Sequence, residues 1–256
     1  MTEKAKKVVF SIFRGTPENG QYQQYPVEVV DGMVVLDAIL DIQARYAPDL
    51  GVRCNCSAGK CGSCSVEING IPKLMCKTRI NDLPARKPII IGPLKSFPGI
   101  KDLVTDISWN YEVNKKIPFF APHKDTDWRM YQFEINRIQE FRKCIECFLC
   151  QDTCHVIRAH DKKNEYFGPR VLVRLAALAM HPLDELKRMQ FIKESAGIGL
   201  CNVTHCCNDV CPEKIKITDN AIIPLKERLA DLFYDPLLVF IHKIFKRNRA
   251  SQKCRP

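Results

Sequence analysis

The sequence predicts an α+β fold in which strands come first and helices follow. Short segments rich in β-branched and aromatic residues, bounded by Gly and Asn, fill roughly the first hundred residues. Apolar residues recur at helical spacing in the rest of the chain. The third observation is that 14 of the 256 residues are cysteines, most of them in three short runs. We therefore expect two domains, residues 1–108 and residues 109–256.

The predicted elements of the first domain follow one another closely. Val8–Phe13 and Tyr25–Val30 have the composition of strands, and the spacing of apolar residues predicts a helix over residues 34–46. After a cysteine-rich loop, the Asn-Gly pair at 69–70 predicts a two-residue hairpin turn. Residues 88–94 form a further short apolar strand.

The second domain is predicted to be helical. Three segments have helical spacing and composition: residues 135–147, 169–180 and 218–234. Pro169 suits a first helical turn and Thr218 a helix N-cap, whereas Pro224 makes the exact start of the last helix ambiguous. We expect the linker between the domains around residues 109–127.

The composition narrows the class of protein. The net charge of +10 is compatible with nucleic acid, anionic lipid or an acidic partner protein, but no basic block is interleaved with aromatic residues, so we expect no nucleic-acid partner. The start of the chain lacks the apolar region of a signal peptide, which favours reduced, metal-ligating thiols over disulfides. No apolar run approaches the roughly 20 residues that cross a bilayer, so we expect a soluble or peripheral protein.

The first cysteine run has the spacing of a plant-type [2Fe–2S] site. The pattern C-x4-C-x2-C is followed by a fourth cysteine beyond the hairpin turn, and the four predicted ligands are Cys56, Cys61, Cys64 and Cys76. Gly59 and Gly62 allow the loop to wrap closely around a cluster. The hairpin register should bring Cys76 nearly opposite Cys64.

Two features of this run need a separate interpretation. Cys54 does not have the required spacing to Cys61, so we interpret it as a bystander. Zinc is the alternative metal, but zinc ribbons use two C-x2-C pairs, and no second pair accompanies Cys61 and Cys64 in that manner.

The second run is C-x2-C-x2-C-x3-C, which is typical of bacterial ferredoxins, and in two-cluster proteins its fourth cysteine serves the other cluster. The third run, LCNVTHCCNDVCP, matches the same pattern at positions one, three and four. Position two is Thr204, so one ligand is missing.

The ligand count follows from this interlocking. The predicted [4Fe–4S] ligands are Cys144, Cys147, Cys150 and Cys211. The remaining set has three thiolates, which favours a [3Fe–4S] cluster, and its members are Cys154, Cys201 and Cys207. Cys206 is off register and is interpreted as structural, with rescue of a fourth iron as the alternative. Three clusters of different type indicate a path along which electrons pass from one cluster to the next. No GxGxxG motif follows a strand, so the sequence does not suggest a flavin or nicotinamide site in this chain.

The three runs, together with DLVTDISW at 102–109 and FGPRVLVRLAAL at 167–178, resemble the iron–sulfur subunit of succinate dehydrogenase and fumarate reductase over nearly the whole chain. The resemblance implies a β-grasp [2Fe–2S] ferredoxin domain followed by an all-α ferredoxin-like domain with two cuboidal clusters. It also implies two kinds of partner, an FAD-containing flavoprotein and a membrane anchor that binds quinone. The complex would lie on the cytoplasmic face of the cell membrane.

The sequence departs from the better-known members of this family just after Cys154. Those members have a proline there and then a tryptophan-containing stretch that shapes the ubiquinone pocket, whereas this chain has His155 and, further on, Arg158. We predict that these two residues and Thr204 lie near the quinone, and menaquinone becomes an alternative to ubiquinone. The competing interpretation is that His155 and Arg158 only pack or face solvent.

Three further expectations concern the end of the chain and the class of protein. Residues 235–249 combine apolar residues with Lys and Arg, which suits a membrane-surface or anchor-contacting helix, with a packed terminal helix as the alternative. Cys254 is interpreted as a tail thiol. The alternatives to a succinate:quinone oxidoreductase subunit are the corresponding subunit of a thiol- or 2-hydroxyacid-linked reductase or oxidase, and a free-standing multi-cluster electron carrier.

Overall fold

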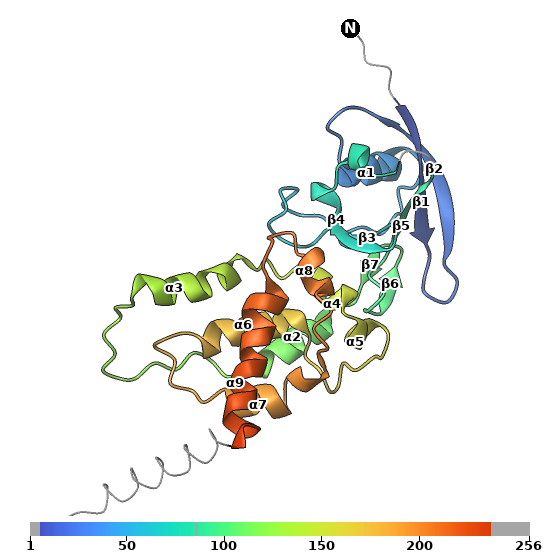
Figure 1. Cartoon of the computed structure of the whole chain (residues 1–256). Coiled ribbons are helices and arrows are strands. Elements are labelled where there is room, and N and C mark those ends of the chain that lie inside the picture. The colour runs from blue at the N-terminus through green and yellow to red at the C-terminus, as the bar shows by residue number, and fades with distance from the viewer. Residues whose placement is uncertain (1–5, 85–86, 237–256) are drawn as a thin grey trace, which may run out of the picture.

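The computed structural model describes residues 6–84 and 87–236, and these form a strand-rich part and a helical part. In Figure 1 the strand-rich part lies at the upper right and the helical part at the lower left. The predicted α+β class is therefore confirmed. The predicted segment 235–249 lies almost wholly outside the described residues, as does Cys254.

A five-stranded mixed sheet organises the first part, in the order β2-β1-β5-β3-β4. Its strands are β1 (Lys6–Arg14), β2 (Gln21–Val29), β3 (Ser65–Ile68), β4 (Ile71–Leu74) and β5 (Ile89–Gly92). β1 pairs antiparallel with β2 and parallel with β5, and β3 pairs antiparallel with β4 and β5. A separate small ribbon joins β6 (Gly99–Lys101) to β7 (Val104–Thr105).

The alternation of apolar residues explains how this sheet buries one face. In β2, Tyr25, Val27 and Val29 are buried while the residues between them are exposed. The helix α1 (Val35–Arg45) packs its own apolar stripe, including Leu36 and Ile39, into the same core. The predicted strands, the first helix and the Asn-Gly hairpin are confirmed, and β2 begins earlier than predicted because its pairing with β1 extends back to Gln21.

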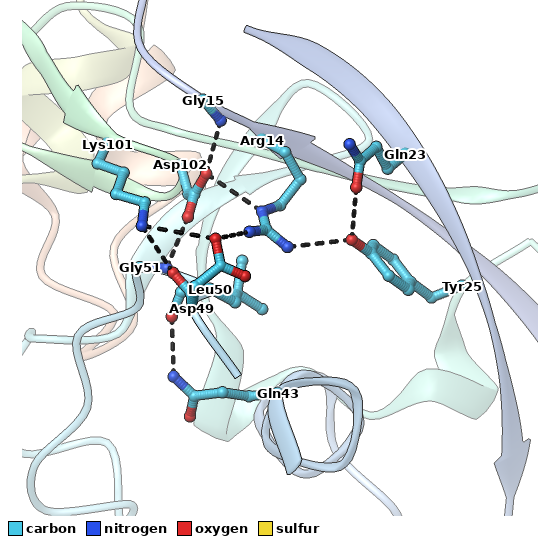
Figure 2. A network of polar contacts seen from close by, with 10 residues as sticks. All are labelled: Arg14, Gly15, Gln23, Tyr25, Gln43, Asp49, Leu50, Gly51, Lys101 and Asp102. Atoms are coloured by element: carbon cyan, nitrogen blue, oxygen red, sulfur yellow. Dashed lines mark hydrogen bonds and ion pairs between the residues drawn. The ribbon is translucent and has the colours of Figure 1, made fainter. Parts of the chain in front are cut away.

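A polar network around Arg14 and Asp102 joins segments that are far apart in the sequence (Figure 2). The buried Asp102 carboxylate accepts hydrogen bonds from the backbone N–H of Gly15, at 2.6 Å, and of Gly51, at 2.7 Å. Arg14 Nε donates to the same carboxylate at 3.2 Å, and Arg14 also contacts Asp49 and the Tyr25 hydroxyl. Asp102 thereby ties the end of β1 to the residue from which the chain enters the cysteine loop.

The second part is built from short helices. These are α2 (Ser108–Lys115), α3 (Gln132–Gln139), α4 (Leu149–Thr153), α5 (His155–Arg158), α6 (Pro169–Ala179), α7 (Met189–Glu194), α8 (Cys206–Asp209) and α9 (Ile223–Phe233). The apolar face of α6, with Val171, Leu172 and Leu175 fully buried, lies at the centre of the second core. Among the described residues, no helix is both long and apolar enough to cross a membrane.

Three predictions for this part need correction. The helix predicted over 135–147 ends at Gln139 and continues only as a 3₁₀ turn over Glu140–Lys143, because the backbone becomes extended at Cys144, with φ of −63° and ψ of 115°. Part of the predicted linker is helical, since α2 occupies Ser108–Lys115.

The prediction for Thr218 is also wrong. It lies inside a π-helical turn over Ile217–Ile222, and its side chain turns toward Cys207 instead of capping a helix. The regular helix α9 starts only at Ile223, with Pro224 in its first turn, where a missing N–H is tolerated.

Candidate metal centres

The first set of cysteines gathers at the edge of the sheet. The hairpin of β3 and β4 brings the Cys64 and Cys76 sulfur atoms to 3.3 Å from each other, as its register predicts. The Cys56 sulfur accepts hydrogen bonds from the backbone N–H of Ala58, at 3.4 Å, and of Lys60, at 3.2 Å. The loop therefore directs two backbone donors toward the Cys56 sulfur. Cys54 is exposed.

Within this set, hydrogen bonding lowers the pKa of one cysteine and burial raises the pKa of another. Hydrogen bonds, the largest from the Ser63 side chain, lower the pKa of Cys61 to about 6, so its thiolate is favoured at neutral pH. Burial raises the pKa of Cys64 to about 12. A neutral thiol at Cys64 would ionise only on binding a metal, as thiolate ligands do.

The second set lines one cavity. It holds all four cysteines predicted for a [4Fe–4S] cluster, and most of its other lining residues are apolar, with Arg170 and Glu213 as the charged ones: Cys144, Cys147, Cys150 and Cys211 with Ile145, Phe148, Val173, Pro212, Ile215 and Ile217. Burial raises the pKa of Cys147 to about 12 and that of Cys150 well above its usual value. The Cys211 sulfur accepts a hydrogen bond from the Ile215 backbone N–H at 3.4 Å. A dry cavity with four thiols suits a cluster of iron and sulfide.

The third set lies close to the second, because Cys150 of the second set and Cys154 of the third lie near opposite ends of the short helix α4. Burial raises the pKa of Cys154 to about 11 and that of Cys207 to about 12, and in both cases the thiols of Cys201 and Cys206 add to the shift. The three predicted ligands therefore lie near one another, and Cys206 lies with them. Cys207 Sγ is 3.2 Å from the hydroxyl oxygen of Thr218.

Sequence reasoning missed the role of Tyr166. This residue is fully buried, and among the described residues its hydroxyl has no hydrogen bond of ordinary geometry. Burial raises the pKa of Tyr166 well above its usual value, reinforced by the nearby thiols of Cys201, Cys154 and Cys207. The Cys201 thiol is near this hydroxyl without ordinary hydrogen-bond geometry, and the sulfur atoms of a bound cluster would supply a better acceptor. No spacing rule links Tyr166 to the cysteine runs, so the sequence carries no signal for it.

The second and third runs share a local backbone geometry. In the second run Glu146 and Phe148, on either side of Cys147, have φ of 55° and 59°. In the third run Val203 and His205, on either side of Thr204, both have φ of 61°. Positive φ is rare outside glycine, particularly at a β-branched residue such as valine. The two loops are therefore folded alike, and Thr204 occupies the place that Cys147 has in the second run.

Two short helices connect the second and third sets. Helix α4 has Cys150 near its start and Cys154 just after its end, and α8 contains Cys207 and is followed by Cys211. These helices pack against each other. Each helix thus positions one cysteine of the second set and one cysteine of the third set. This is the crossed arrangement that the spacing predicts.

The loops of the first and second sets touch. A side-chain carbon at Gly62 would lie 2.6 Å from Cys147 Cα, so only glycine fits there, and its φ of +70° also favours glycine. The Ser65 hydroxyl donates to the backbone carbonyl of Cys147 at 2.9 Å, and Lys60 pairs with Glu213 at 3.6 Å. The three sets of cysteines therefore lie in series.

Of the three residues predicted to lie near the quinone, two lie side by side and the third points elsewhere. Thr204 Oγ1 and His155 Nδ1 are 3.4 Å apart, beside the third set. Arg158 instead turns toward the strand-rich part, where its guanidinium lies 2.7 Å from Glu67 and 3.8 Å from Asp152. Within the described ranges, no three His, Cys, Asp or Glu side chains converge closely enough to hold a single metal ion.

A strand-rich domain with one four-cysteine loop, joined to a helical domain with two crossed cysteine sets, defines a multi-cluster iron–sulfur protein. Residues 9–112 match the 2Fe-2S iron-sulfur cluster binding domain, and residues 140–215 match the 4Fe-4S dicluster domain.

Relatives of known class agree with this assignment. The chain is 30% identical to the succinate dehydrogenase iron–sulfur subunit of Coxiella burnetii over 81% of this chain and 91% of that protein. It is 52% identical to a chain of the Mycobacterium smegmatis Sdh1 complex, with a TM-score of 0.88, over 91% of this chain and 99% of that chain. The protein belongs to the family of succinate dehydrogenase and fumarate reductase iron–sulfur subunits.

An archaeal relative differs in length. The chain is 30% identical to a subunit of the fumarate reductase (CoM/CoB) of Methanothermobacter marburgensis, over 83% of this chain but 42% of that protein. The chain thus spans less than half the length of the archaeal relatives that it matches.

Proposed function

We propose that this chain relays single electrons between FAD in a flavoprotein partner and quinone at a membrane anchor, as the iron–sulfur subunit of a succinate:quinone oxidoreductase. The observation that carries the proposal is the contact between Gly62 and Cys147, which puts the loop of the first cysteine set directly against that of the second. Succinate oxidation and fumarate reduction would use the same path in opposite directions.

The proposed ligands are those that the spacing predicts, within domains 1–108 and 109–256. Cys56, Cys61, Cys64 and Cys76 would hold a [2Fe–2S] cluster. Cys144, Cys147, Cys150 and Cys211 would hold a [4Fe–4S] cluster. Cys154, Cys201 and Cys207 would hold a [3Fe–4S] cluster. When bound, these clusters supply one-electron redox chemistry at potentials set by cluster type, hydrogen bonding and solvent exposure.

The protein side chains supply the environment that tunes this chemistry. Backbone N–H groups at Ala58 and Lys60 donate to Cys56, and the Thr218 hydroxyl lies against Cys207. Cys150 is buried in the second cavity, among mostly apolar side chains. The first set is therefore the more exposed and the second the more buried, which supports entry of electrons at a protein partner and passage through a dry interior.

The exit for electrons is proposed beside the third set. His155 and Thr204 are partly exposed there, and the quinone pocket of the complex would include these side chains together with the membrane anchor. In this proposal His155 would donate a hydrogen bond to a quinone oxygen. Arg158 is proposed to act differently, by holding the two domains together. The chain would thus lie on the membrane surface, on the cytoplasmic face.

A second candidate is the iron–sulfur subunit of a thiol-linked fumarate reductase. The observation in its favour is the similarity to the CoM/CoB fumarate reductase of M. marburgensis over most of this chain. The substrate distinguishes the two, because a thiol-linked complex reduces fumarate with thiols and without quinone.

Purification of the native complex tests both candidates. We expect a flavoprotein and a membrane anchor to copurify with the chain, and electrons to pass from succinate to a quinone analogue. EPR-monitored redox titration should resolve three centres. Isolation of a stable holo-monomer without partners would contradict the first candidate, and thiol-dependent fumarate reduction without quinone activity would establish the second.

A further inference from the structure

The third cysteine set contains one more thiol than its proposed cluster uses. Cys206 is the first residue of α8 and directly precedes Cys207. Its sulfur lies 3.4 Å from the Thr204 hydroxyl oxygen, and that oxygen lies 3.4 Å from Nδ1 of His155, the residue next to Cys154. Cys206 therefore brings a fourth thiol to the third set.

The position of Cys206 matches the missing corner of the cluster. Thr204 stands where Cys147 stands in the second run, because the residues on either side of each have the same positive φ. The Thr204 hydroxyl donates to Cys206 Sγ at 3.4 Å. The extra sulfur is therefore within one hydrogen bond of the atom that replaces the absent ligand.

We propose that Cys206 is a fourth thiol ligand at the third centre, where it binds one additional ferrous ion and completes a [4Fe–4S] cluster. The inference rests on the proposed assignment of Cys154, Cys201 and Cys207 to that centre. Cys206 is partly exposed, so iron can reach it from solvent. Thr204 keeps the corner polar and hydrogen-bonded when the fourth iron is absent.

The step balances with ferrous iron as the only co-reactant. One electron, which the relay supplies, first reduces the three-iron core from three ferric ions to two ferric and one ferrous. The Cys206 thiol then loses its proton to solvent, and its thiolate binds an added ferrous ion. The product contains two ferric and two ferrous ions, and no further oxidant or reductant is required.

The test uses the full-length chain with its three centres assembled anaerobically from iron and sulfide. Wild type, Cys206→Ala and Cys54→Ala are reduced with dithionite and incubated with ferrous iron, and iron content, Mössbauer spectra and the EPR signal of the three-iron centre are measured. Cys54→Ala is the matched control, since it removes an exposed thiol outside the third set. Thr204→Cys is the positive control, because it restores the complete ligand pattern.

We expect wild type and Cys54→Ala to lose the three-iron signal and gain one iron per chain, while Cys206→Ala keeps the signal. A four-iron centre in freshly purified wild type that becomes a three-iron centre in Cys206→Ala also supports the proposal. Conversion of Cys206→Ala as readily as wild type overturns it. Retention of the signal in wild type, while Thr204→Cys converts, overturns it as well.

Failure of the proposed function would look different from failure of this inference. Zinc without acid-labile sulfide in all variants would refute the cluster assignment and the role of Cys206 together. If the [2Fe–2S] and [4Fe–4S] signals are intact and the third centre behaves alike in wild type and Cys206→Ala, only the inference is refuted. Those two intact signals also show that Cys206→Ala has folded.

Discussion

Arg158 Nη2 lies 2.7 Å from Glu67 Oε1, and this ion pair joins helix α5 of the helical domain to strand β3 of the strand-rich domain. The two acidic partners of Arg158, Glu67 and Asp152, are 3% and 0% exposed, whereas the arginine side chain is 27% exposed. Lys95 also pairs with Glu67, and the backbone N–H of Ser96 donates to Asp152. Two buried carboxyl groups therefore share one arginine at the domain interface.

Replacing Arg158 with methionine should destabilise the protein. The substitution keeps an apolar stem but leaves two buried carboxyl groups without their guanidinium, which should cost about 2–3 kcal/mol, at the lower end for a buried pair because Arg158 is partly exposed. Arg129→Met is the matched control: the pair of Arg129 with Asp127 is exposed and should contribute about 0.5 kcal/mol or less. Thermal unfolding followed by circular dichroism measures both, and equal melting temperatures would contradict the prediction.

The same cluster predicts a pH dependence of stability. Burial, and to a smaller extent the nearby Glu67, raises the pKa of Asp152 to about 7, whereas an unfolded aspartate has a pKa of about 4. The folded state therefore binds the extra proton between about pH 4 and pH 7, and its stability falls as the pH rises through that window and levels off above it.

Asp152→Asn removes this titration while keeping an oxygen for the Ser96 N–H. The melting temperature of wild type should therefore fall relative to that of Asp152→Asn between about pH 5.5 and pH 7.5. Parallel curves for the two proteins over this range would show that the carboxyl group does not titrate there.

A methyl group at Gly62 should separate the first and second cysteine loops. Gly62→Ala brings a carbon to 2.6 Å from Cys147 Cα, so the backbone has to move, and electron transfer from the first centre to the second should slow several-fold. Gly70→Ala is the control, because Gly70 has a similar φ of +79° but no atom within 4 Å of the added carbon. Rapid-freeze EPR measures the rate of reduction of each centre, and the same rate in both variants would exclude a specific effect of the contact.

Tyr166→Phe should lower the reduction potential of the third centre. A hydrogen bond from the hydroxyl to cluster sulfur favours the reduced, more negative form, and such a bond contributes about 1 kcal/mol. That energy corresponds to about 40 mV for a one-electron couple. EPR redox titration gives the potential, and the first centre serves as the internal reference. An unchanged third potential would mean that the buried hydroxyl does not point at the cluster.

Asp102→Ala should weaken the attachment of the first cysteine loop. The substitution leaves the backbone N–H groups of Gly15 and Gly51 without their acceptor and Arg14 without one of its partners, at a cost of about 2–3 kcal/mol. Asp49→Asn removes the other, exposed carboxylate of Arg14 and should have little effect. Chemical denaturation measures stability, and the visible absorbance of the first centre reports its retention. Equal stability of the two variants would contradict the role of Asp102.

The local sequence pattern predicted the geometry correctly where a single short-range rule determines it. The Asn69-Gly70 turn determines the hairpin register, and with it the closeness of Cys64 and Cys76. The crossed arrangement of the second and third runs likewise follows from spacing. The predicted helix over 135–147 was too long because the backbone leaves helical geometry at Cys144 and has positive φ at Glu146, although the helical pattern of apolar residues continues.

Features that depend on distant parts of the chain were not predictable. Arg158 pairs with Glu67, which is far away in sequence and reaches it only through the packing of the two domains, so no local pattern indicates the pair. Tyr166 reaches the third set by a fold of the chain that no motif marks. Thr218 had the composition of an N-cap, yet the π-helical turn directs its hydroxyl toward Cys207.

The crossed contributions of α4 and α8 have a consequence for assembly. Under the proposed ligand assignment, neither cuboidal cluster can be completed from one cysteine run alone, so each cluster is also an inorganic cross-link between chain segments far apart in sequence. Closing such a long loop costs conformational entropy, and the metal–sulfur bonds offset it only when both segments are in place. Maturation of the helical domain should therefore be cooperative, with both clusters and the native packing acquired together.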